Sequence, residues 1–278
     1  MYTNADTLTN KMRELQILAI ERKADIIMIT EVRPKHTKEI LSKQQFMLEG
    51  YDLYTNIEEE EEARGVAVYI AKHLALRAHE IEIDSDFNES IWVQLNISES
   101  TKIKLGCVYR SPTSLPVNDD KLHKLLAESN SRGSSQIIVM GDFNHPEIDW
   151  NTKTTEKGMY HRSQLFLDAV RDAYLIQHID TPTRFRHGQN PHILDLLLTN
   201  EDNMIRNVEY HAGLGLSDHV VITCNLQVNS QKQKKAEPRF RYHKGDYQKM
   251  NQNLVEIDWE SNLNSLTAED AWKFSPLC

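Results

Sequence analysis

Apolar residues are grouped along the chain in short runs that are separated by polar, turn-rich segments. Near the N-terminus they recur at helical spacing, at Leu8, Met12, Leu15 and Ala19, which predicts a helix with one apolar face. Further helices are predicted at residues 119–129 and 163–173. The remaining apolar runs are of strand length, and they cover residues 24–31, 64–72, 89–97, 103–112, 137–142, 192–200 and 219–228.

Most of these strand-length runs are continuously apolar, which is typical of strands covered on both faces. Many short strands with helices between them predict two stacked sheets flanked by helices, an α/β sandwich. Residues 32–64, by contrast, are polar and turn-rich, and their acidic run Glu58–Glu62 predicts a solvated loop or a hairpin tip. We expect residues 145–160 to be irregular as well.

The composition changes after Val228, where we predict a domain boundary. Residues 1–228 would form the α/β domain, and residues 229–278 would form a linker and a partial helical segment with too few apolar residues for a core of its own. The start of the second part is basic: it contains Lys232, Lys234, Lys235, Arg239, Arg241, Lys244 and Lys249 against only Glu237 and Asp246.

Composition narrows the class of protein. The 278 residues are 40% hydrophobic and 26% charged, the balance of a soluble globular protein. No run reaches the length of a membrane span, and the N-terminus lacks a signal-peptide pattern. Three widely spaced cysteines, Cys107, Cys224 and Cys278, indicate a reduced intracellular compartment and neither a disulfide framework nor a zinc site.

The net charge of −9 argues against a protein that coats nucleic acid by charge alone. It leaves a nuclease open, because a metal ion bound among acidic residues supplies local positive charge. Net charge is therefore a weak guide to the partner of this chain.

Polar residues interrupt or end the apolar runs at several places. Asp195 is the least ordinary of them, because Leu194 and Leu196 crowd it and an unpaired charge there would be costly, so a His or Arg partner is expected. Each of the others has a bland explanation as a turn former or strand-end residue. Taken together they predict one shared site, since ligands gather where strand ends converge. The set is Asn4, Asp6, Glu31, Tyr109, Arg110, Asp142, Asn144, Asp195, Ser217, Asp218 and His219.

The motifs that hold these residues form an ordered set: "YTNADTL", "ITE", "VYRSP", "GDFN", "LDLLLTN" and "SDH". In this order and spacing they resemble the endonuclease/exonuclease/phosphatase superfamily, and most of all the apurinic-type endonuclease domains that precede the reverse transcriptase of non-LTR retrotransposons. The resemblance covers residues 1–228, and the later stretch from "FRYHKGDYQKM" to "IDW" resembles the segment that joins nuclease to reverse transcriptase. It implies a DNase I-like, four-layer α/β sandwich and metal-assisted hydrolysis of phosphodiesters.

The resemblance also implies a metal site of oxygen ligands. Glu31 is the best candidate ligand for Mg²⁺, with Asp6 and Asn4 beside it, and Mn²⁺ would suit the same oxygens. Asp218 would accept a second metal or position a neighbouring group. The alternative for Glu31 is a strand-end acid that faces solvent.

Four further residues would carry the reaction. Asp142 would orient or deprotonate the attacking water, and Asn144 would hold the water or a phosphate oxygen. His219 would contact the scissile phosphate in its charged form, and Asp195 would orient the ring and raise its pKa.

Three residues have two open interpretations. Tyr109 would donate a hydrogen bond to the phosphate or pack on the sheet as a strand-end aromatic. Arg110 would pair with the phosphate or with a surface acid. Ser217 would contact the phosphate or only shape its turn.

The substrate expected from the resemblance is DNA, nicked in the nucleus to leave a 3′-hydroxyl. "VYRSP" and the basic tail favour DNA, although the tail could equally be a solubilising linker. Two alternatives remain: a phosphatase or phosphodiesterase of the same superfamily that acts on small phosphoesters, or a catalytically dead, truncated relic that only binds. A serine hydrolase is excluded for "SDH", because adjacent strand residues point to opposite faces and cannot form a relay. The sequence leaves the oligomeric state open.

Overall fold

The computed structural model describes residues 1–35, 41–57, 64–99, 101–131, 135–228, 245–264, 266–267 and 270. The acidic run Glu58–Glu62 and the basic segment 229–244 lie outside these ranges. Contacts divide the chain into two compact units, Met1–Gln231 and Lys232–Cys278. Within the described ranges, no helix combines the length and the apolar character that a membrane crossing requires.

The first unit contains two sheets of six strands each. The strands of one sheet are β1 (Tyr2–Asn4), β2 (Ile26–Thr30), β3 (Tyr51–Thr55), β4 (Val66–Ala71), β13 (Ile205–His211) and β14 (Val221–Leu226). Those of the other are β5 (Ala78–Glu80), β6 (Ser90–Asn96), β7 (Lys102–Tyr109), β8 (Gln136–Asp142), β11 (Ile176–Gln177) and β12 (Asp195–Thr199). The smaller elements of this unit are β9 (Ile148–Asp149), β10 (Thr154–Thr155), α2 (Lys72–Ala75) and the 3-10 turns Lys43–Phe46 and Asp202–Met204.

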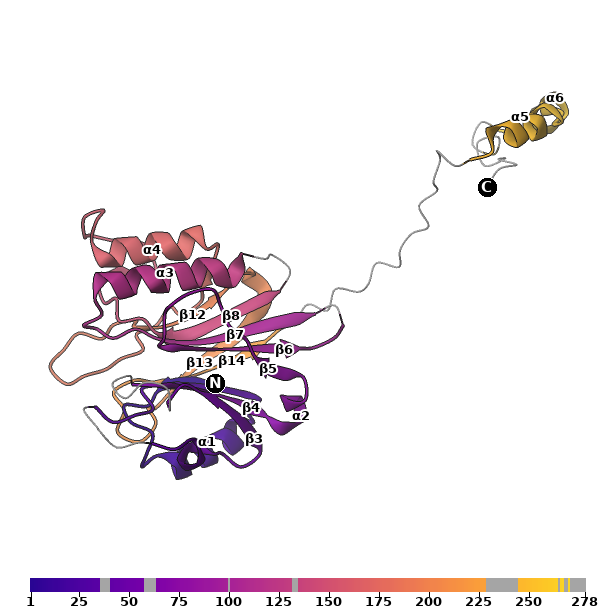
Figure 1. Ribbon diagram of the computed structural model, residues 1–278. Helices are drawn as coiled ribbons and strands as arrows, with labels where there is room; N and C mark the ends of the chain where they lie inside the picture. The colour runs from indigo at the N-terminus through magenta and orange to yellow at the C-terminus, as the bar shows by residue number, and fades with distance from the viewer. Residues whose placement is uncertain are drawn as a thin grey trace. The chain divides into compact units, whose positions relative to one another are not determined.

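Helices cover the outer faces of both sheets. Helix α1 (Met12–Arg22) lies against the first sheet, and α3 (Pro116–Asn130) and α4 (Arg162–Asp172) lie side by side over the second (Figure 1). The strand orders are β13-β14-β1-β2-β4-β3 and β11-β12-β8-β7-β6-β5. The layers are therefore helix, sheet, sheet and helix, which is the four-layer α/β sandwich expected from the sequence.

Each strand packs on both faces: one face contacts the opposite sheet, and the other contacts the helix layer. In β4, Val66, Val68 and Ile70 point into the core between the sheets, while Ala67 and Tyr69 pack on the side of α1. Burial of each such aliphatic side chain contributes roughly 1.5–3 kcal/mol. Strands buried on both faces explain why the runs in the sequence are continuously apolar and do not alternate.

The structure corrects the prediction for residues 32–64. Its described part 41–57 includes the turn Lys43–Phe46 and strand β3, and Phe46, Leu48 and Leu53 are buried. β3 pairs with β4 over five residue pairs. Backbone hydrogen bonds to β4 therefore stabilise a strand that the polar local sequence does not predict. The expected irregular stretch 145–160 likewise contains the short β9–β10 hairpin.

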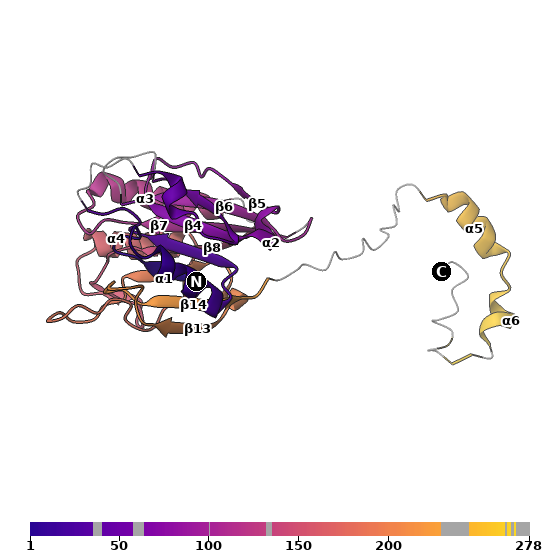
Figure 2. The ribbon, with the colours of Figure 1, turned by 90° about the horizontal axis from the view of Figure 1, so that it is seen from below.

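The second unit contains α5 (Tyr247–Val255) and α6 (Trp259–Leu263), which Figures 1 and 2 show in yellow. Neither helix has a buried residue. Figure 2 views the first unit from the side of α1, where this helix crosses the face of its sheet.

Candidate active site

Strand β8 ends on a carboxylate that faces the space between the sheets. Ile138 and Met140 point into that core, and Asp142 follows them at the period of two. Asp142 pairs in register with Tyr109 of β7 and with Asp195 of β12. Three neighbouring strands therefore bring these side chains into one row.

Gly141 allows the strands to approach closely at this row. A Cβ atom at Gly141 would lie 2.0 Å from the carbonyl oxygen of Val108 on β7. Any side chain would push β8 away from β7 and displace Asp142, which follows directly. The glycine of "GDFN" thus has a steric role in placing the acid.

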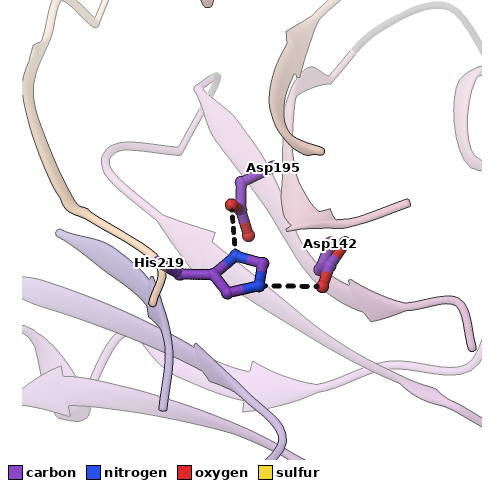
Figure 3. Close-up of side chains that lie close together, drawn as sticks. All are labelled: Asp142, Asp195 and His219. Carbon is purple, nitrogen blue, oxygen red and sulfur yellow. Dashed lines mark hydrogen bonds and ion pairs between the residues drawn. The ribbon is translucent and has the colours of Figure 1, made fainter. Parts of the chain in front are cut away.

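Asp195 has the partner that its crowded position predicted. Its Oδ2 lies 2.7 Å from Nδ1 of His219, as Figure 3 shows. Its Oδ1 accepts a hydrogen bond of 2.7 Å from the hydroxyl of Tyr2. The hydroxyl oxygen of Thr183 accepts hydrogen bonds from the N–H groups of Leu194 and Asp195, which fixes the start of β12. The carboxylate is fully buried and fully engaged.

The other ring nitrogen of His219 faces acids. Its Nε2 lies 3.9 Å from Oδ2 of Asp142 (Figure 3). It also lies 3.7 Å from Oδ1 of Asp218. Burial by itself lowers the pKa of His219, but the surrounding carboxylates, Asp195 first, outweigh it and raise the pKa to about 9. The imidazole is therefore a cation at neutral pH.

Asp142 lies in a more negative environment. Burial and then repulsion from Asp195 raise its pKa to about 8, with Glu31 adding to the rise and His219 opposing it. The amide of Asn4 donates a hydrogen bond of 2.9 Å to Oδ2 of Asp142, so β1 of one sheet holds the acid of the other. The Asn4 side chain thus positions Asp142, and its expected place beside a metal stays a prediction.

Glu31 reaches the same space because its backbone leaves the strand. In β2, Ile27 and Ile29 pack on the side of α1, and continued alternation would send Glu31 there as well. Glu31 instead has φ of 54°, in the left-handed region, which ends the strand at a cost of about 1–2 kcal/mol. The Tyr109 hydroxyl donates to the Glu31 carboxylate, and the pKa of Tyr109 is raised, chiefly by burial.

Two of the expected metal ligands, Glu31 and Asp6, lie around an arginine that the sequence analysis did not single out. Nη2 of Arg64 pairs with the carboxylate of Glu31 and lies 3.0 Å from Oδ1 of Asp6. The Asp6 side chain is half exposed, and its N–H donates to Oδ1 of Asn4. Asp6, like Glu31, has a positive φ, of 38°.

Asn144 is held by the strand ends and not by a distant group. It has φ of 51°, its N–H donates to Oδ1 of Asp142 at 3.1 Å, and its side-chain amide donates to the carbonyl of Arg110 at 2.9 Å. Both of these contacts use nitrogen donors of Asn144, so among the described residues its side-chain oxygen remains available for a ligand.

Arg110 does not face the site, contrary to both expected partners. Its guanidinium is fully buried on the side of α3 and donates to both oxygens of Asp119, at 2.7 and 3.1 Å. It also donates to the carbonyl oxygens of Phe143 and Asn144, both at 3.2 Å. The alternation of β7 accounts for this, since Tyr109 points between the sheets and the next residue must point away.

The "SDH" turn is also tied internally. The Ser217 hydroxyl donates to the carbonyl of Asn4 at 2.7 Å and accepts from the N–H of His219 at 3.3 Å, which is its turn-shaping role. Oδ2 of Asp218, expected near a second metal, lies 3.0 Å from Nε of Arg184.

Sequence reasoning missed three contributors: Tyr2, Arg64 and Thr183. Tyr2 could have been found, because it stands two positions before Asn4 in a short strand and therefore shares its face. Arg64 and Thr183 carry no local signal, since both act through the placement of loops beside distant strands.

Asp142, Asp195 and His219 offer ligand atoms that all lie within 4.8 Å of one another, which would admit a metal ion. Their hydrogen bonds argue otherwise. Both oxygens of Asp195 and Nδ1 of His219 are already engaged. A positively charged imidazole is also a poor ligand, because metal binding needs the neutral ring.

Glu31 and Asp6 fit a divalent cation better. Their carboxylates converge on one nitrogen of Arg64, so a positive charge already stands where both can reach it. Mg²⁺ prefers oxygen ligands and needs only one or two carboxylates. The Arg64 guanidinium thus supplies, between these two carboxylates, the positive charge that a metal ion would supply.

Comparisons with known proteins give a match to one family model and a set of similar folds. Residues 103–223 match a family model described as endonuclease-reverse transcriptase. No curated protein matches the sequence. Among solved structures, the endonuclease domain of TRAS1, a telomere-specific non-LTR retrotransposon, is 17% identical with a TM-score of 0.58, and the match covers 82% of this chain and 98% of that one.

Two further solved structures have similar TM-scores. An AP endonuclease from Archaeoglobus fulgidus is 12% identical with a TM-score of 0.60, over 82% of this chain and 99% of that one. A 3′ phosphatase from Neisseria, bound to a product DNA hairpin, is 15% identical with a TM-score of 0.57, over 81% and 98%. At these identities the likeness establishes the fold, and it confirms the DNase I-like architecture expected from the motifs.

Proposed function

We propose that this chain, which has the fold of the endonuclease/exonuclease/phosphatase superfamily and matches the endonuclease-reverse transcriptase family over residues 103–223, is a metal-dependent endonuclease that nicks DNA in the nucleus. The observation that carries the proposal is the buried row of Asp142 and Asp195 with the charged His219 between them. A phosphodiester supplies the negative charge that this imidazolium would meet, and water supplies the proton that a carboxylate would take.

Glu31 and Asp6 would hold the divalent cation, for which Mg²⁺ is the first candidate and Mn²⁺ the second. When bound, the cation neutralises charge on the phosphate and on the leaving oxygen. It also favours the ionised form of Asp142, because a nearby positive charge lowers the pKa of a carboxyl group.

Asp142 is placed to act on water. Asn4 orients one of its oxygens and the N–H of Asn144 orients the other, so the carboxylate has a fixed direction. It would take a proton from water as the water oxygen bonds to phosphorus and the bond from phosphorus to O3′ breaks. The products are a 5′-phosphate and a 3′ oxygen that takes up a proton to become the 3′-hydroxyl.

His219 is placed to stabilise the charge that develops. Asp195 fixes the ring through Nδ1, so Nε2–H is directed toward the region of Asp142 where the phosphate would sit. A preorganised donor of this kind is typically worth 10²–10³-fold in rate, about 3–4 kcal/mol. Tyr2 in turn fixes Asp195 and thereby the ring.

The test is nicking of supercoiled plasmid in Mg²⁺, followed by extension of the nicked product by a DNA polymerase. We expect wild type to give open circles that the polymerase extends, which reports a 3′-hydroxyl. His219→Ala and Glu31→Gln should lose at least about a hundredfold in rate. Nicking that survives both substitutions would remove the site assignment.

Competing substrates test the alternatives within the superfamily. An inositol phosphate and a lipid phosphodiester, offered beside plasmid, should be hydrolysed far more slowly than DNA is nicked. Faster hydrolysis of either would make the chain a small-molecule phosphoesterase. Absence of every activity in a folded, Mg²⁺-saturated protein would support the inactive relic.

A further inference from the structure

Arg64 lies in the site region, but the proposed reaction gives it no role. Its side chain is only 11% exposed, although arginine is usually a surface residue. Nη2 serves both Glu31 and Asp6, whereas Nε and Nη1 are buried and have no hydrogen-bond partner among the described residues. Desolvated donors without partners are unfavourable, so the two carboxylates are what holds this guanidinium in place.

The backbone of Arg64 is anchored beside the end of β2. Its carbonyl accepts the N–H of Arg33 at 2.8 Å, and the next carbonyl, of Gly65, accepts the N–H of Val32 at 3.2 Å. The stem of the side chain is therefore fixed next to Glu31, while its long chain of rotatable bonds lets the charged end move. The guanidinium is held in place by its two carboxylate partners and not by the covalent geometry of its side chain. Another cation can therefore take its place on these carboxylates.

We propose that Arg64 is an internal counter-ion that holds Glu31 and Asp6 in the metal-free protein and is displaced when a divalent cation binds these carboxylates. The inference rests on the proposed function, which assigns the metal to Glu31. A guanidinium and a divalent cation repel each other, so both cannot stay on the same two carboxylates.

Two effects follow from the exchange. Without metal, Arg64 prevents repulsion between Glu31 and Asp6, so the site keeps its shape. With metal, the work of removing Arg64 is subtracted from the binding free energy, so the apparent metal affinity is lower than the carboxylates alone would give. Arg64 thereby sets the metal concentration at which the site fills.

The experiment measures Mn²⁺ binding by calorimetry and by the electron paramagnetic resonance of free Mn²⁺, without substrate. The variant is Arg64→Met, which keeps the length and removes the charge. Arg171→Met is the matched control, because Arg171 also pairs with one acid, Asp168 at 3.3 Å, but is exposed on α4. We expect Arg64→Met to bind Mn²⁺ about tenfold more tightly, and the control to bind as wild type.

Thermal unfolding gives a second readout. In EDTA, Arg64→Met should unfold at a lower temperature than Arg171→Met, and saturating Mn²⁺ should raise its Tm by more than it raises that of wild type. Arg64→Lys keeps the charge and should stay near wild type in Mn²⁺ affinity. Arg64→Gln removes the charge and keeps a polar end, so it should also bind Mn²⁺ more tightly and replaces the methionine variant if that variant does not fold; wild-type affinity in Arg64→Gln would overturn the counter-ion.

The outcomes separate the two proposals. If Glu31→Gln abolishes Mn²⁺ binding but Arg64→Met and Arg64→Gln both bind as wild type or more weakly, the counter-ion is overturned and the metal site stands. If Glu31→Gln binds Mn²⁺ as wild type does, the metal site of the proposed function fails, and the counter-ion fails with it.

Discussion

Two buried polar clusters lie on opposite faces of the strand ends of β7 and β8, and their charges are balanced differently. The site cluster, between the sheets, holds three carboxylates and one imidazolium: Glu31, Asp142, Asp195 and His219. The arginine cluster, on the side of α3 and α4, holds two guanidinium groups and one carboxylate: Arg110, Asp119 and Arg162, with the ring of His145 beside them.

The arginine cluster is internally satisfied. Burial would raise the pKa of Asp119, but hydrogen bonds from Arg110 and Arg162 outweigh it and lower the pKa. Arg162 donates to Asp119 through Nε at 3.2 Å and Nη2 at 2.7 Å, so the N-terminal parts of α3 and α4 are linked to the β7 end. Arg110 also donates to the carbonyl oxygens of Phe143 and Asn144, so the cluster supports the Asn144 turn.

Two histidines show the difference most directly. Burial lowers the pKa of both. Carboxylates around His219 reverse the effect and raise its pKa to about 9, whereas arginines add to it at His145 and lower its pKa to about 2. His145 stacks on Phe166, with ring centroids 4.4 Å apart, and acts as a core residue. Both rings are buried, so the sign of the neighbouring charge, and not depth, gives the two histidines opposite pKa shifts.

The largest expected effect is a loss of nicking activity on substitution in the site cluster. Asp142→Asn should reduce plasmid nicking by about a thousandfold or more, because the amide cannot take a proton from water. The Tm should change little, because a carboxyl group with a pKa of about 8 is already largely protonated at pH 7, so the amide replaces a neutral group. Nicking assays check the expected loss of activity, and thermal unfolding checks the Tm. Substantial nicking by the folded variant would show that another group is the base.

Asp119→Asn, in the arginine cluster, should reduce stability strongly and activity only slightly. It leaves Arg110 and Arg162 without their anion and should cost about 3–5 kcal/mol in the free energy of unfolding, measured in urea. Activity per folded molecule should fall far less than in Asp142→Asn. A variant as stable as wild type would mean that the arginine cluster is not the support inferred here.

Asp195→Asn tests how the site cluster raises the pKa of His219. Loss of the nearest carboxylate should lower this pKa from about 9 by roughly 1–3 units, read from the ring protons by NMR. His192→Gln, at an exposed histidine, assigns the signals and should leave the His219 titration unchanged. A midpoint that stays near 9 in Asp195→Asn would move the cause to Asp142 and Asp218.

The smallest expected effect concerns His145. Its folded pKa of about 2 lies below the unfolded value of 6.5, so only the unfolded chain gains a proton as pH falls below 6.5. Stability from this group is present above pH 6.5 and is lost progressively below it, by about 2 kcal/mol near pH 5. His145→Gln should remove this part of the acid sensitivity, measured by urea unfolding at both pH values. An unchanged pH slope would contradict the assignment.

Much of the candidate site was accessible from sequence because its residues end strands. Apolar runs indicate where β2, β8 and β12 lie, and the acids at their ends converge: Glu31 directly after β2, Asp142 at the end of β8 and Asp195 at the start of β12. The need for a partner at Asp195 followed from the cost of an unpaired buried charge, and the partner is His219. What each of these residues does in catalysis stays a prediction.

By itself, then, the sequence determined the layers, the strand ends and the set of acids, because burial and strand period are local properties of a chain. Only the tertiary structure decided which side chains meet. Asn4 and Asp142 are 138 positions apart, and their contact depends on how two sheets stack. The same stacking directs Arg110 to Asp119 and brings Arg64 to Glu31, since a side chain of fixed charge pairs with whichever opposite charge the fold places within its reach.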